Sequence, residues 1–192
     1  MTTLINGADA ATAGNALPAD TRILAAYVGQ PGQTDATHVW SADEWNFYLN
    51  PESPRYGGPD LRVLPIFVHD FPGDPVRLAN DACDAAIALG WSDKKHRLLV
   101  VDLETLIDDA YVTGLNLQIR KRGFAMIKYG SPSTINQNPP VDGGTWMALL
   151  QRRRPSVLPP GTVGDQWSWG VWDQTVWSEF VYENCGRGMR KA

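Results

Sequence analysis

The chain has 192 residues, a formal net charge of −4, 43% hydrophobic residues and 20% charged residues. This length fits one domain with a buried core, and we expect residues 1–192 to form that single domain. The balance of hydrophobic and charged residues excludes a disordered chain. The acidic net charge argues against nucleic acid as a partner, because domains that bind nucleic acid usually carry a basic surplus.

Local composition excludes further classes of protein. No stretch of about 18 apolar residues occurs, so we expect no membrane span. The N-terminal segment lacks the basic and apolar regions of a secretory signal. Cys83 and Cys185 are too few for a disulfide framework. Cys83 falls on the apolar face of a predicted helix, where a free, buried thiol is expected.

Five segments in the first two thirds of the chain have the composition of strands. They are apolar runs bounded by turn residues or helix signals, and they cover residues 3–9, 22–28, 61–68, 97–104 and 124–129. The run at 61–68 is almost continuously apolar, which is typical of a strand covered on both faces. Such strands belong in a parallel sheet flanked by helices.

Helix signals fall between the later strands. Ser41 and Glu44 form a capping box, which predicts a helix that ends near residue 49. The sequence Asp-Pro at 74–75 supplies an N-cap and a first helical residue for a second helix, which stops at Gly90. A third helix begins near Asp108 and ends in basic residues before Gly123. Alternating strands and helices predict parallel strands joined by crossovers.

The pattern changes in the last third of the chain. Three more strand-like runs occur at 145–150, 163–168 and 171–177, and their connections are too short and too rich in Pro and Gly for full helices. Eight strands with helices only in the earlier part predict an α/β fold, a trimmed (β/α) TIM-like barrel.

The strand at 97–104 ends in two acids, Asp102 and Glu104. Alternate residues of a strand share a face, so the two side chains point the same way, roughly 7 Å apart along the backbone. Two neighbouring carboxylates in a partly buried cleft are costly to keep charged together, so we expect Glu104 to hold its proton to higher pH. This arrangement suits acid and base catalysis on a sugar linkage. The alternative is that the two acids cap the next helix.

Further candidate residues lie near the ends of other strands. Asp9 ends the first strand and Asp173 lies in the last, so four carboxylates meet at one mouth if the barrel closes. Four aromatic residues fall at comparable places and could stack on sugar rings or simply fill the core: Tyr27, Tyr129, Trp146 and Trp167. We expect no metal or other cofactor, because neither His69 nor His96 has a second ligand at a familiar short spacing.

The order of these motifs carries a family resemblance. Gly7-Ala8-Asp9, Asp102-Leu103-Glu104, Gln166-Trp167 and the run Trp-Asp-Gln-Thr-Val-Trp at 172–177 resemble the glycoside hydrolase family 25 lysozymes. They resemble equally the glycoside-hydrolase-like domains of unknown function in actinobacteria and their phages. The resemblance spans residues 9–177, and it implies a barrel of five β/α units followed by three strands.

The resemblance also implies an activity and a set of site residues. Family 25 enzymes cleave the β-1,4 bond from N-acetylmuramic acid to N-acetylglucosamine in bacterial cell walls. Glu104 matches the general acid, and Asp102 matches the carboxylate that steadies the transition state or the N-acetyl group. Asp9 and Asp173 match the two flanking acids, and Gln166 joins the aromatic residues as a substrate contact.

Two functions of different classes follow. The first is a muramidase-like glycoside hydrolase that acts on peptidoglycan or a related polysaccharide, and the four acids favour it. The second is a catalytically inactive barrel that binds glycan or forms part of a phage particle or cell-surface assembly. The loop at 131–136 and the Trp-rich last third differ from a typical lysozyme and favour the second. A fold by itself does not decide between them.

Overall fold

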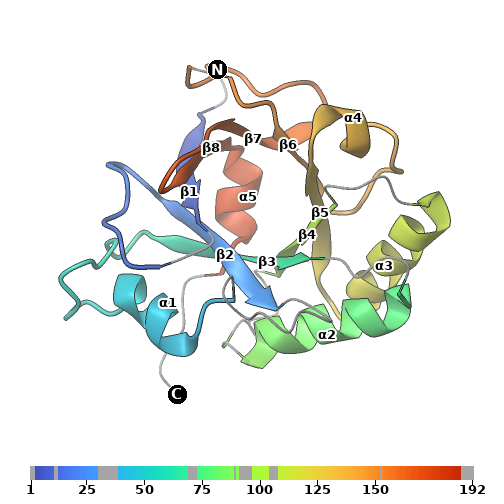
Figure 1. The fold of residues 1–192 in the computed structure, drawn as a ribbon, viewed down its shortest axis with the longest axis horizontal. Coiled ribbons are helices and arrows are strands. Elements are labelled where there is room, and N and C mark those ends of the chain that lie inside the picture. The colour runs from blue at the N-terminus through green and yellow to red at the C-terminus, as the bar shows by residue number, and fades with distance from the viewer. Residues whose placement is uncertain are drawn as a thin grey trace.

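The computed structural model describes residues 3–10, 13–29, 39–68, 73–88, 90, 97–103, 108–151 and 153–186. Eight strands close into a barrel in chain order (Figure 1). They are β1 (Ile5–Asp9), β2 (Ile23–Gly29), β3 (Arg62–Val68), β4 (Leu98–Asp102), β5 (Ala125–Gly130), β6 (Gly144–Ala148), β7 (Thr162–Ser168) and β8 (Asp173–Trp177). Neighbours from β1 to β7 are parallel, whereas β8 is antiparallel to both β7 and β1. The predicted TIM-like barrel is confirmed.

The helices only partly alternate with the strands. They are α1 (Ala42–Leu49), α2 (Pro75–Ala88), α3 (Asp109–Lys121), α4 (Pro132–Ile135) and α5 (Glu179–Asn184). The first three were predicted, including the capping box of α1, and Cys83 on α2 is a free, buried thiol as expected. The described part of the connection between β1 and β2, residues 10 and 13–22, contains no helix. None of the described helices is long and apolar enough to cross a bilayer.

Helix α5 closes the end of the barrel where the parallel strands begin. Gly186, just after the helix, pairs with Val63 at the start of β3. The Tyr182 hydroxyl donates to the Asp60 carbonyl at 3.1 Å and accepts from the Arg22 guanidinium. Val181 packs into the barrel interior, and α5 lies across the centre of the ring of strands in Figure 1. The opposite end, where β1 to β7 finish, is therefore the mouth of the barrel.

Two large aromatic rings fill the barrel below its mouth. Trp146 and Trp177 are fully buried, and their ring centroids lie 4.6 Å apart. Glycines on neighbouring strands make room for them: a Cβ on Gly7 would lie 2.6 Å from Trp177 Cδ1, and one on Gly164 would lie 2.6 Å from Trp177 Cε3. Real Cβ atoms do not approach other atoms so closely, so these two positions require glycine for reasons of space.

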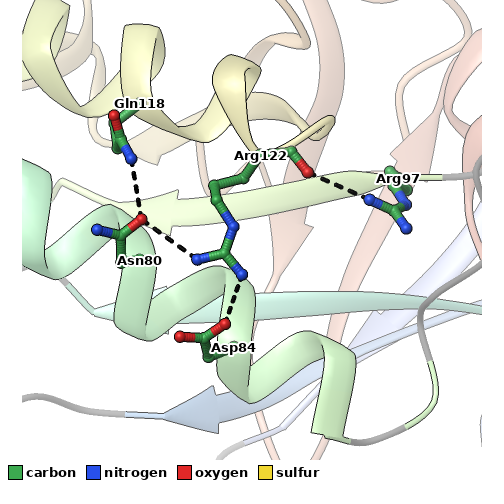
Figure 2. Close-up of polar contacts among 5 residues, drawn as sticks. All are labelled: Asn80, Asp84, Arg97, Gln118 and Arg122. Atoms are coloured by element: carbon green, nitrogen blue, oxygen red, sulfur yellow. Dashed lines mark hydrogen bonds and ion pairs between the residues drawn. The ribbon is translucent and has the colours of Figure 1, made fainter.

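A polar cluster fixes α2 against α3 on the outside of the barrel (Figure 2). Asn80 Oδ1 accepts from Gln118 Nε2 at 2.9 Å and from Arg122 Nη1 at 3.2 Å. The Arg122 guanidinium also pairs with Asp84, and the backbone carbonyl of Arg122 accepts a hydrogen bond from Arg97 Nη1 at 3.2 Å. Since Arg97 directly precedes β4, these bonds tie both helices to the strand that carries Asp102.

Candidate functional site

The inner face of the barrel ends at the mouth in a ring of polar and aromatic side chains. In β1, Ile5 and Gly7 face the interior, so the alternation of a strand points Asp9 inward too. On other strands too, the polar or aromatic residue at the mouth lies two positions from a residue that faces the interior, so its side chain also points inward. We define the mouth cluster as Asp9, Tyr27, Asp102, Tyr129, Gln166 and Asp173.

Asp173 reaches the mouth because β8 runs against the other strands. The first residue of β8 therefore lies level with the last residue of β1, and Asp9 is the direct partner of Asp173 in the antiparallel pair. Side chains directly opposite in such a pair have Cβ atoms about 4.5–5.5 Å apart, and like charges there repel each other. The two carboxyls thus form a close acid pair across β1 and β8.

Burial and like charge act together on this acid pair. Burial raises the pKa of Asp9 well above its usual value, and the charges of Asp173 and Asp102 raise it further. Burial also raises the pKa of Asp173, while hydrogen bonds from the Gly170 N–H and the Gln166 side chain oppose that rise. Asp9 is consequently the member of the pair that holds a proton more readily.

Hydrogen bonds connect the remaining members of the mouth cluster. The Tyr27 hydroxyl donates to Asp102 Oδ2 at 3.1 Å, and burial beside that carboxylate raises the pKa of Tyr27. The Tyr129 hydroxyl donates to Gln166 Oε1 at 2.6 Å. This bond orients the Gln166 amide, because the oxygen is occupied and the NH₂ group is left to donate to Asp173. One hydrogen bond therefore links β2 to β4, and two others link β5 to β7 and β7 to β8.

The carboxyls of the mouth cluster lie in different environments. Asp9 Oδ1 is buried and has no hydrogen-bond partner among the described atoms, which disfavours a charge on this carboxyl. Asp102 is instead set up as an acceptor by Tyr27. Carboxyls held in different environments within one site are the usual basis for dividing acid and base roles. Across the described ranges, no group of three or more His, Cys, Asp or Glu side chains is placed to hold a metal ion.

The structure brings most of the predicted site residues together. Asp9, Asp102 and Asp173 meet at the mouth with the predicted substrate contacts Tyr27, Tyr129 and Gln166. Glu104 lies outside the described residues, two positions after Asp102, and so do His69 and His96. The general-acid role of Glu104 stays a prediction from the sequence.

Two predicted substrate contacts have different surroundings. Trp146 is fully buried and lies below the mouth, with its ring centroid 4.3 Å from that of Tyr129. Because it is fully buried and packs on Tyr129 and Trp177, Trp146 offers no exposed ring face to a sugar in this structure. Trp167 is half-buried at a register shift between Gln166 and Ser168, and its role as a contact stays a prediction.

Thr175 is a member of this region that sequence reasoning missed. It pairs with Gln166 across β7 and β8, and its buried Oγ1 has no hydrogen-bond partner among the described atoms. The signal for it was its spacing: Thr175 follows Asp173 by two residues in one strand, so the two share a face. Threonine is common in strands for packing reasons, which is why the spacing alone does not single it out.

Comparisons with known proteins support the fold. No family model matches the chain, and no curated protein matches it. Among solved structures, the chain is similar to the 1.07 Å crystal structure of an uncharacterized B. stearothermophilus protein. The TM-score is 0.69 with 17% sequence identity, over 94% of this chain and 99% of that chain. At this identity the likeness shows the fold alone.

Proposed function

We propose that the protein is a glycoside hydrolase that cleaves β-1,4 linkages of bacterial cell-wall peptidoglycan, as a muramidase does. The observation that carries the proposal is the gathering of Asp9, Asp102 and Asp173 at the mouth of a closed barrel, with two tyrosines and a glutamine between them. Glycosidases use paired carboxyls, one protonated and one charged, on either side of the scissile bond.

Each acid has a distinct part in this proposal. Glu104 donates its proton to the leaving glycosidic oxygen, a role that rests on the family resemblance and on its place two residues after Asp102. Asp102, held by the Tyr27 hydroxyl at 3.1 Å, steadies positive charge that develops on the sugar or orients its N-acetyl group. The pair Asp9 and Asp173 supplies a buried proton and a hydrogen-bonded carboxylate at the adjoining edge of the mouth.

The proposal is tested by the loss of turbidity of purified cell walls. Wild-type protein is expected to clear the suspension, and Glu104→Gln should be slower by about 10²- to 10⁴-fold, because a glutamine cannot transfer a proton. Asp81→Asn, at an exposed position on α2, is the matched control and should clear like wild type. A wild-type protein that binds walls without clearing them would contradict the proposal and leave a glycan-binding barrel.

A further inference from the structure

The turn between β7 and β8 exposes two apolar side chains at the mouth. Trp169 is 73% exposed and Val171 is 67% exposed. Scattered apolar residues are normal on protein surfaces. A nearly free tryptophan is less ordinary, because its ring has a large apolar area that gains from being covered. Its position in the fold therefore decides what it signifies.

The turn that carries Trp169 is held firmly on both sides. The Gly170 N–H donates to Asp173 Oδ1 at 2.9 Å, and Ser168 pairs with Gln174 beneath the turn. Trp172, after the turn, is buried among aromatic rings: its centroid lies 5.6 Å from that of Tyr48 and 6.1 Å from that of Trp40. Trp169 is thus displayed from a braced turn, which lowers the entropy cost of covering its ring.

The same turn is joined to the mouth cluster. Asp173 accepts the hydrogen bond from the turn and is also the direct partner of Asp9 in the strand pair. An exposed indole therefore stands at the rim, with carboxyl, hydroxyl and amide groups on the inner side. A pyranose ring needs this combination, since it offers an apolar C–H face to an aromatic ring and hydroxyl groups at its edge to polar atoms.

We propose that Trp169 forms a sugar subsite at the rim of the barrel, where its ring stacks on one pyranose unit of a β-linked polysaccharide. Val171 widens the apolar edge of this subsite. The sugar that reaches the carboxyls is then a different unit of the same chain, so Trp169 contributes to affinity and not to bond cleavage. The substrate class, though not the placement of Trp169, rests on the proposed function.

The subsite is tested with a hexasaccharide of β-1,4-linked N-acetylglucosamine by calorimetry, in the Glu104→Gln background so that the ligand stays intact. Trp169→Ala and Trp169→Leu should each weaken binding by about tenfold, because both lose the flat face that stacks on the sugar. Trp169→Tyr keeps a flat ring and should stay within about threefold. Each variant is expected to fold normally, since Trp169 is mostly exposed.

Phe180→Ala is the matched control. Phe180 is an aromatic residue, 45% exposed, on α5 at the closed end of the barrel, and its removal should leave the affinity unchanged. Equal affinities for Trp169→Ala and Phe180→Ala would overturn the subsite, as would a hexasaccharide that does not bind at all. Loss of binding to anionic phospholipid vesicles in Trp169→Ala, with sugar affinity unchanged, would also overturn it and assign the turn to a membrane surface.

The failure of the subsite is distinguishable from the failure of the proposed function. If wild type hydrolyses the glycan and Trp169→Ala binds the sugar as tightly as the protein with Trp169, the subsite is overturned and the proposed hydrolase function stands. Weakened sugar affinity in Trp169→Ala, with no hydrolysis by wild type, would support the subsite on a barrel that binds glycan without cleaving it.

Discussion

Replacing Asp9 with Asn should make the protein more stable at neutral pH and less dependent on pH. The pKa of Asp9 is raised in the folded state, so between the usual aspartate value, about 3.9, and its own value the folded chain holds a proton that the unfolded chain has lost. The contribution of Asp9 to the free energy of unfolding is therefore greatest below about pH 4 and falls as pH rises through this window. The slope is at most about 1.4 kcal/mol per pH unit.

Thermal unfolding between pH 4 and pH 8 measures this effect. For a domain of 192 residues, 1 kcal/mol corresponds to about 2–4 °C in Tm. The Tm of Asp9→Asn should thus gain about 3–6 °C on wild type for each pH unit within the window. Asp81→Asn, on the exposed face of α2, serves as the control and should follow wild type throughout. Parallel Tm curves for wild type and Asp9→Asn would refute the idea that burial and like charge raise the pKa of Asp9.

Further changes probe the interior and the loop after β5. Trp146→Ala should lower the free energy of unfolding, measured in urea, by about 3–5 kcal/mol, because it leaves a cavity at the centre of the barrel. A loss below about 1 kcal/mol would contradict the packing described. Gly7→Ala should cost about 1–3 kcal/mol through the clash with Trp177, and Trp177→Phe should cancel part of that cost in a double-mutant cycle. Lys128→Met removes the Nζ donor that serves three backbone carbonyls in the segment 135–139 at 2.7–3.0 Å. The substitution should lower the free energy of unfolding by at least about 2 kcal/mol and speed amide hydrogen exchange in that segment. Unchanged exchange would show that the segment does not depend on Lys128 for its order.

The order of strands could be read from the sequence because each signal is local. Each strand was predicted from its own apolar run, and two helix starts were predicted from the capping residues at 41–44 and at Asp108. These elements agree with the structure. The helices α4 and α5 were missed because four and six residues give too little periodicity to detect. The direction of β8 was also left open, since a strand pattern is the same in both directions.

The candidate site was predicted in part for the same physical reason. Strand ends identified Asp9 and Asp102, but only the antiparallel pairing of β8 explains why Asp173, at the start of its strand, meets Asp9. The sequence left open whether Trp146 fills the core or contacts a sugar, because the outcome depends on Gly7 and Gly164 leaving room for rings on other strands. Contacts between distant strands of this kind have no local signature in the sequence.

The central claim, that the mouth of the barrel hydrolyses cell-wall glycan, is tested most directly by digesting purified peptidoglycan in ¹⁸O-labelled water and weighing the products. We expect wild type to release fragments that carry one ¹⁸O atom at a new N-acetylmuramic acid reducing end. Glu104→Gln should release them about 10²- to 10⁴-fold more slowly. Intact strands without ¹⁸O after prolonged incubation with folded wild-type protein would contradict the claim.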